Sequence, residues 1–162
     1  MNHFILLGII YFAFISLGLP DSVLGVAWPT MRATLLQPIE AAGLITLVLT
    51  ICSAISSFAS SAVLKRLGTG PVVMISGLLT GLALLGFSFG PTFGVLLLLA
   101  IPLGLGAGSV DAGLNHFVAQ HYSSRHMNWL HGCWGIGATL GPIIMGMALA
   151  TATGWMQGYR HI

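Results

Sequence analysis

Charged residues are scarce in this chain of 162 residues, since aspartate, glutamate, lysine and arginine together make up only 5% of it. An ordinary soluble domain has about 25% of such residues and uses them to cover its surface. The apolar fraction is 56% instead. The composition therefore excludes a soluble globular domain and predicts a membrane protein whose main partner is the lipid bilayer.

Basic stripes and enzyme motifs are also missing. The five lysines and arginines are scattered, so the sequence gives no sign of nucleic-acid binding. Neither Gly-x-Ser-x-Gly nor His-Glu-x-x-His occurs, and the glycine-rich run at 104–108 has no lysine to close a nucleotide loop. We therefore expect no enzyme activity and no cofactor.

The positions of the cysteines and histidines do not indicate a metal or redox site. Cys52 and Cys133 both fall within apolar runs, where a buried free thiol behaves as a small hydrophobic residue. Four of the histidines recur every five residues, at His116, His121, His126 and His131. Five residues advance a helix by about 500°, so these side chains spiral around the axis and do not converge. No metal site is expected.

Long apolar runs are what the sequence has instead. About 20 apolar residues cross a bilayer, and five runs reach or approach that length. The expected spans cover about residues 4–28, 41–64, 72–89, 93–119 and 129–153. The expected connections cover residues 29–40, 65–71, 90–91 and 121–128, with a final loop at 154–162. The sequence thus predicts an all-α membrane protein with about five transmembrane helices.

Loop charges favour one orientation of these spans. A cytoplasmic amino terminus would place three basic residues in inner loops and two in outer loops. These are Lys65, Arg66 and Arg125 inside, and Arg32 and Arg160 outside. Lysine and arginine concentrate on the cytoplasmic side, so this orientation is preferred.

Trp28, Trp129 and Trp155 fall near the expected span ends, where aromatic side chains commonly meet the membrane interface.

Two of the three acidic residues, Asp21 and Asp111, interrupt apolar runs. A carboxylate in hydrocarbon costs roughly 2.5–3.5 kcal/mol even on insertion-based scales. No lysine or arginine lies inside a span to pair with either acid, so each could carry a proton. The alternative is structural, with Asp111 bonded within a packing seam and Asp21 capping a helix. Gly18 and Pro20 weaken the helix just before Asp21 and predict a break there.

Small residues mark one face of two expected spans. In the fourth span, four small or polar residues follow the spacing i, i+4, i+7, i+11: Gly104, Gly108, Asp111 and Asn115. They share one helical face, which must meet protein or water. In the fifth span, Gly137 and Gly141 form a small-xxx-small pair just before Pro142, which favours close helix packing.

Two further stretches resemble the amino-terminal half of a major facilitator superfamily transporter, and the resemblance covers nearly all of the chain. Residues 64–68 stand where the superfamily usually has an Asp-Arg-x-Gly-Arg-Arg cytoplasmic turn. Arg66 and Gly68 match that turn, whereas Lys65 replaces its acid. Residues 137–142, Gly-Ala-Thr-Leu-Gly-Pro, resemble the Gly-Pro motif of the fifth helix, which is common in proton-coupled drug exporters.

The fourth span is similar to that of the fucose/proton symporter group, where an acid lies four residues before Asn-x-Phe-Val. Here Asp111 precedes Asn115 by four residues, and no arginine of the drug-exporter type is present. Residues 128–138 also resemble the start of the fifth helix in sugar permeases of that group. The resemblance implies that Asp111 couples transport to protons, that Asp21 lies near substrate, and that Asn115, Asn128 and His131 line the path.

The superfamily fold implies two six-helix halves with substrate held between them near the midplane. This chain supplies about five helices, so we expect a fragment that needs a carboxy-terminal half. The implied function is proton-coupled transport of a small polar solute, a sugar, across the cell membrane. Two alternatives remain, a proton-coupled drug exporter and a truncated membrane remnant that transports nothing.

Overall fold

The computed structural model describes residues 3–90, 92–151 and 154–162. Within these ranges the regular structure is helical throughout. The helices are α1 His3–Gly18, α2 Val23–Leu35, α3 Ala41–Leu67, α4 Thr69–Phe87, α5 Phe93–His121, α6 Ser124–Leu149 and α7 Gly154–His161. Helices suit so apolar a chain because each one satisfies its own backbone N–H and C=O groups, for which hydrocarbon offers no partner.

Five helical segments are long and apolar enough to cross a membrane. They are Phe4–Leu35, Ala41–Leu67, Thr69–Phe87, Phe93–His121 and Ser124–Leu149. The first of them combines α1 and α2, which are separated by a short break. The structure confirms the predicted all-α class with about five transmembrane helices.

The first span ends later than the sequence predicted. α2 continues through Pro29 to Leu35, whereas the prediction placed a connection at residues 29–40. α1 and α2 have 16 and 13 residues, which at about 1.5 Å per residue make about 24 Å and 20 Å of helix, together more than the hydrocarbon core of about 30 Å. A helix can therefore extend beyond the apolar layer, and the loss of apolar character at residue 29 does not mark its end.

The fifth span begins earlier than predicted, at Ser124 instead of residue 129. Its first turns are polar, so an apolar run could not reveal them. His126 and Asn128 consequently lie on a helix and not in a loop. The helix ends at Leu149, and residues 152–153 at the end of the predicted span lie outside the described residues. Residue 91, which belonged to a predicted turn, lies outside them as well.

Residues 154–161 form α7, where the sequence predicted a loop. Trp155 and Tyr159 are both buried on one face of this short helix. The Tyr159 ring packs against Phe87 with centroids 5.1 Å apart, and Trp155 Nε1 donates a hydrogen bond to Thr34 Oγ1 at 3.4 Å. Burial raises the pKa of the Tyr159 hydroxyl. The aromatic face holds α7 against the bundle, which the polar composition of this segment concealed.

Two of the tryptophans expected at the membrane interface face protein instead. The Trp28 and Trp155 side chains are 4% and 1% exposed, whereas Trp129 is 58% exposed. Trp28 Nε1 also donates a hydrogen bond to the Ile39 carbonyl oxygen at 2.9 Å, across the connection between α2 and α3. The indoles of Trp28 and Trp155 therefore close the end of the bundle where α2, α3 and α7 meet.

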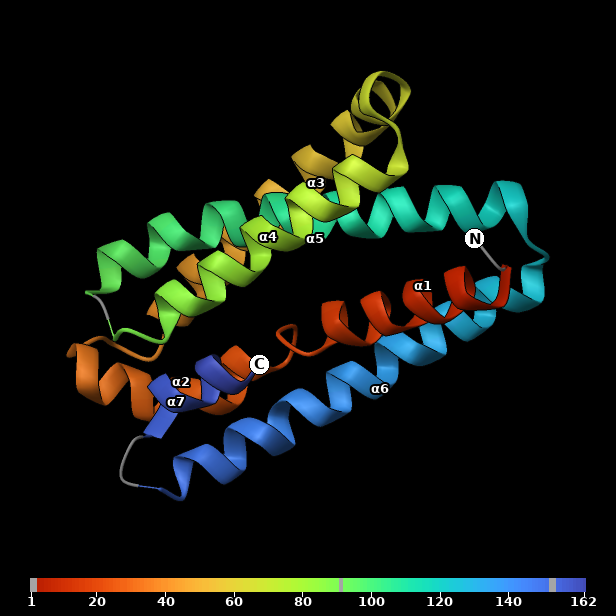
Figure 1. Cartoon of the computed structure of the whole chain (residues 1–162). Helices are drawn as coiled ribbons and strands as arrows, with labels where there is room; N and C mark the ends of the chain where they lie inside the picture. The colour runs from red at the N-terminus through yellow and green to blue at the C-terminus, as the bar shows by residue number, and fades with distance from the viewer. Residues whose placement is uncertain (1–2, 91, 152–153) are drawn as a thin grey trace.

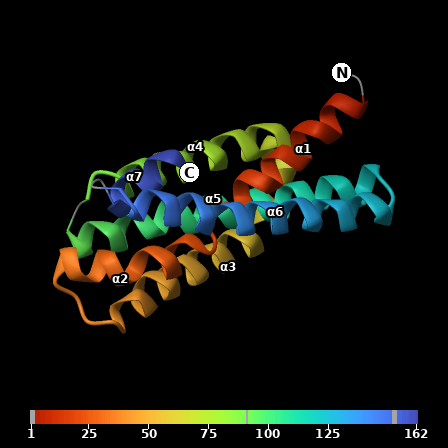
Figure 2. The ribbon, with the colours of Figure 1, turned by 90° about the horizontal axis from the view of Figure 1, so that it is seen from below.

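The helices form two groups, as Figure 1 shows. α3 and α4 pack along α5, while α1, α2 and α7 pack along α6. Viewed from below in Figure 2, α2 and α3 lie along one side of the molecule and α4 along the other. The break between α1 and α2 faces α3 and α5, since Pro20 and Asp21 line a common cavity with residues of both helices.

Close approach of α3 and α5 depends on small residues. A Cβ atom added to Gly104 or Gly108 of α5 would collide with the backbone of α3. Hydroxyl groups seal the same contact, because Ser56 Oγ in α3 donates to the Leu105 carbonyl oxygen at 2.6 Å and also bonds to Ser109 Oγ. Such hydrogen bonds between helices help to hold membrane helices together where the hydrophobic effect cannot.

Close approach of α1 and α6 uses the same device. A Cβ atom at Gly137 would meet the Ile15 carbonyl oxygen, and one at Gly141 would meet that of Leu19. Gly137 faces α1 of the same chain and Gly141 faces Leu19, the residue that follows α1, which accounts for the small-xxx-small pair without a second copy. Pro142 lies within α6, which continues beyond it.

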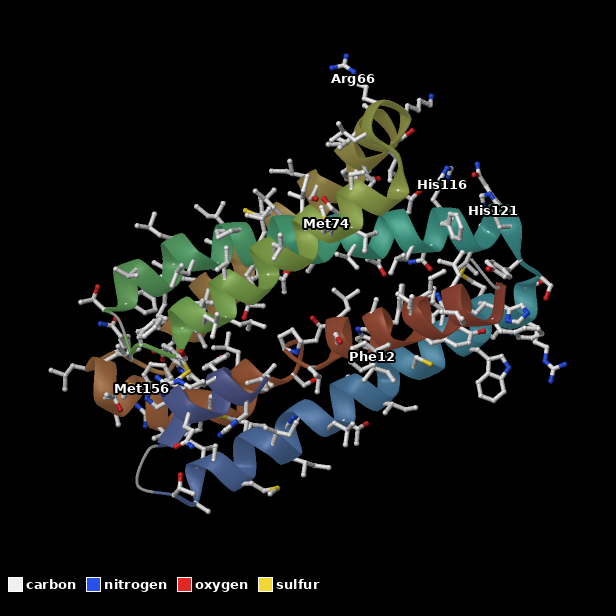
Figure 3. The ribbon with its side chains drawn as sticks, viewed as in Figure 1. Phe12, Arg66, Met74, His116, His121 and Met156 are labelled. Atoms are coloured by element: carbon white, nitrogen blue, oxygen red, sulfur yellow. The ribbon has the colours of Figure 1, made fainter. Side chains whose placement is uncertain are left out.

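The connection between α3 and α4 is shorter than the predicted turn at residues 65–71. Only Gly68 separates the two helices, and its φ of 78° lies in the left-handed region that favours glycine. Lys65 and Arg66 belong to the last turn of α3, where cations interact favourably with the helix dipole. Pro71 fits the first turn of α4 because its missing N–H would have no partner there. Figure 3 shows Arg66 at the tip, pointing away from the bundle.

Candidate functional site

The first feature of the site is the break between α1 and α2. Pro20 has no N–H to continue the helix, and turn hydrogen bonds take over. The Asp21 N–H donates to the Gly18 carbonyl oxygen, and the Val23 N–H donates to that of Pro20, both at 3.3 Å. The break lies where glycine and proline predicted it. It presents the Asp21 side chain at the surface of the chain instead of burying it in a continuous helix.

Asp21 is held by a partner on α6. The Trp134 Nε1–H donates a hydrogen bond to Asp21 Oδ2 at 2.7 Å. The two helices are close enough for this because Gly18 packs directly on the Trp134 backbone carbonyl. Sequence reasoning gave Trp134 no such role, and the 113 residues that separate the pair leave no local signal. An indole N–H is a donor without acceptor capacity, so a carboxylate is a suitable partner.

Trp134→Phe tests this bond, because it keeps an aromatic ring but removes the donor. Hydrogen bonds to charged groups contribute about 1.5–3 kcal/mol, so we expect the free energy of unfolding to fall by about that amount at most. The measurement is unfolding in detergent, followed by helical circular dichroism. Trp129→Phe is the matched control, since the Trp129 side chain is exposed five residues earlier on the same helix. Equal stability of both variants would show that the Asp21 bond contributes nothing.

Asp111 lies on α5 and is bonded within its own helix. Asn115 Nδ2 donates a hydrogen bond to Asp111 Oδ1 at 3.0 Å, while Asn115 Oδ1 is buried and has no partner among the described residues. Asp111 also lies within electrostatic range of His131 on α6 and of Asp21. The structure thus brings Asp21, Asp111, Asn115 and His131 towards one region between α1, α5 and α6. Asn128 is exposed in the second turn of α6.

A cavity of about 520 Å³ lies beside the helix break, between α2, α3 and α5. Asp21 lines one side of it, and four hydroxyl side chains of α3 line the other. They are Thr46, Thr50, Ser53 and Ser57, at the spacing i, i+4, i+7, i+11 that defines one helical face. Small residues of α5, Gly104 and Ala107, complete the wall. The volume falls within the range of about 300–1,000 Å³ that is usual for small-molecule sites.

The sequence was not interpreted as placing a hydroxyl face on α3, although the spacing of its threonines and serines is regular. The sequence predicts residues 41–64 only as one of the membrane spans. Asp21 is the only residue among those predicted to contact solute that lines this cavity. Asn115, Asn128 and His131 lie elsewhere, nearer to α6 or on it. The predicted residues are therefore divided between a cavity beside α3 and a polar region beside α6.

Metal binding finds no geometric basis in the described part of the chain. No group of three or more histidine, cysteine or acidic side chains within it is arranged to hold a metal ion. Figure 3 shows His116 and His121 on the side of α5 that is turned away from α1. The other two histidines of the regular series, His126 and His131, belong to α6.

These features define a helical membrane protein of several spans, with a broken first span and a carboxylate beside a polar cavity. The family model of the Major Facilitator Superfamily matches residues 10–158. The chain therefore belongs to this superfamily, whose members are membrane transporters. A search of curated proteins finds no match to the chain.

Proposed function

We propose that the chain forms one half of a secondary active transporter that moves a small polar solute, a sugar, by proton-coupled alternating access. The observation that carries this proposal is the cavity in which Asp21 faces the hydroxyl side chains of α3. Sugar hydroxyls both donate and accept hydrogen bonds, so carboxylate and hydroxyl side chains suit them. No lysine or arginine lines the cavity, which disfavours an anionic solute.

Proton coupling is assigned to Asp111, with Asp21 as a second titrating group that also contacts solute. Both carboxylates accept hydrogen bonds from neutral groups, an amide and an indole, so neither of these two partners fixes the carboxylate in its charged form. Similarity of residues 104–118 to the fucose/proton symporter group supports the same assignment. Asn115, Asn128 and His131 would extend the polar lining towards α6.

A second six-helix half is the proposed partner, because transporters of this type hold their substrate between two halves. It would cover the open side of the cavity and the exposed face of Asp111. We place the assembly in the cell membrane with the amino terminus in the cytoplasm. Lys65, Arg66 and Arg125 would then lie at the cytoplasmic end, as the distribution of basic residues favours.

The test uses the complete transporter, this chain together with its second half, in liposomes that contain a pH-sensitive dye. Addition of a transported sugar outside is expected to drive protons inward and acidify the lumen, and a panel of sugars identifies the solute. Protein-free liposomes give the background leak. If apolar cations and not sugars moved protons, the protein would be a drug exporter. If neither sugars nor apolar cations moved protons, the proposal that this assembly is a transporter would be wrong. That outcome is the one expected of a non-transporting remnant.

A further inference from the structure

A separate polar cluster lies where α1 begins and α5 gives way to α6. Tyr11 Oη of α1 forms a hydrogen bond with His126 Nδ1 of α6 at 2.7 Å. The ring of Tyr122, which caps α5, meets the His126 ring edge-on with centroids 5.5 Å apart. Three titratable rings from three elements thus converge within otherwise apolar packing. The cavity beside α3 does not include them, so the solute site gives them no role.

Two polar atoms, one of them in this cluster, are buried without a hydrogen-bond partner in the described part of the chain. They are Tyr122 Oη and Asn115 Oδ1. Buried polar groups are rarely left unpaired, and ordered water commonly bridges those that side chains do not reach. Asn115 lies on α5, and Tyr122 follows the last residue of that helix, seven positions further along the chain, or about 10 Å at helical rise. Transfer of a proton between the two side chains would require bridging water.

We propose that these groups form a path for protons between Asp111 and the end of the bundle at which α1 begins. In order, its members are Asp111, Asn115, Tyr122, Tyr11 and His126. The proposal rests on the proposed proton-coupling role of Asp111. Its starting contact is the Asn115–Asp111 hydrogen bond, and its final contact is the Tyr11–His126 hydrogen bond.

Each step conserves protons without forming a new covalent bond. The Asp111 carboxyl gives its proton to water that Asn115 Oδ1 orients, and the amide itself does not titrate. Each tyrosine hydroxyl accepts one proton and passes on its own, so it ends neutral. His126 takes a proton at Nδ1 and releases one from Nε2, which is the tautomeric exchange that suits histidine to proton relay.

The groups around the path support its direction. Tyr11 lies within electrostatic range of Tyr122, Cys133 and Arg125, and Asp111 lies within range of His131. Arg125, the residue just before His126, is exposed, so the His126 end of the path lies beside water. Asp21, the second carboxylate of the region, lies within electrostatic range of Asp111 and therefore near the starting end of the path.

The path can be tested by infrared spectroscopy of the complete transporter in lipid nanodiscs. After a jump in pH, the carbonyl band of the protonated Asp111 carboxyl reports the rate of proton transfer, and its absence in Asp111→Asn assigns it. Tyr11→Phe and His126→Gln are each expected to slow this rate by at least about tenfold, because positioned proton donors and acceptors contribute 10²–10⁴-fold to such steps. His121→Gln, which changes an exposed histidine outside the path, is expected to leave the rate unchanged.

Unchanged rates in both Tyr11→Phe and His126→Gln would overturn the path. Sugar exchange at equal concentrations on both sides serves as the folding control, because it does not require net proton release. The proposed function fails on a different readout, namely the absence of sugar-driven proton movement in the unaltered protein. Slow proton transfer in the two variants would still support the path in that case.

Discussion

Asp111→Asn is expected to abolish sugar-driven proton movement, with a loss of at least about 100-fold in the initial rate. Asparagine is close in size to aspartate and can still accept the hydrogen bond from Asn115, so the fold should persist. It cannot bind or release a proton, so net transport coupled to protons must stop. The measurement is lumenal acidification in liposomes, alongside radiolabelled sugar exchange that needs no change in protonation.

Glu40→Gln is the matched control for that experiment. Glu40 is the third acidic residue of the chain, exposed just before α3 and outside the candidate spans. Its neutralisation removes the same charge without touching the polar region between α1, α5 and α6. Proton movement should equal that of the unaltered protein. If Asp111→Asn also retained full proton movement, the coupling role of Asp111 would be wrong.

Gly141→Leu is expected to have the largest effect on stability. Any side chain at this position enters the space of the Leu19 carbonyl group, so α6 must separate from the break between α1 and α2. Overpacking of a well-packed contact typically lowers the free energy of unfolding by about 1–3 kcal/mol and occasionally by more. We expect leucine at position 141 to lie at the upper end of this range, because it displaces backbone and not a side chain. The measurement is the midpoint of thermal unfolding in detergent, followed by circular dichroism.

The matched control is Gly146→Leu in the same helix. A Cβ at Gly146 meets nothing within 4 Å, so leucine should be accommodated there. Removing a glycine from a helix interior should even add up to about 1 kcal/mol of stability. Equal unfolding midpoints for Gly141→Leu and Gly146→Leu would contradict the close packing of α1 on α6.

The sequence predicted the helical class and about five candidate spans because bilayer thickness imposes a minimum length on each apolar run. It predicted span ends less well, since the end of an apolar run is not the end of a helix, as residues 29–35 of α2 and 124–128 of α6 show. α7 was missed because its composition is largely polar, while Trp155, Gly158 and Tyr159 on one face are buried against the bundle.

Side-chain partners were harder to predict than helices. The bond between Asp21 and Trp134 depends on how two distant helices cross, which no local pattern encodes. The hydroxyl face of α3 was hidden for a different reason. A threonine can satisfy itself within an apolar helix, as Thr46 does by donating to the Ala42 carbonyl oxygen at 3.1 Å. Its presence in a span therefore does not by itself indicate a cavity.

The glycine contacts between α1 and α6 have a consequence for the evolution of this chain. Gly137 and Gly141 meet carbonyl groups, which every residue has, and not the side chains of Ile15 and Leu19. A larger residue at either glycine therefore cannot be compensated by a smaller one opposite. In an alignment of relatives, the two glycine positions should therefore be fixed, and the residues opposite them should vary without correlated substitutions. Contact inference from covariation should consequently be weakest where these two helices are closest.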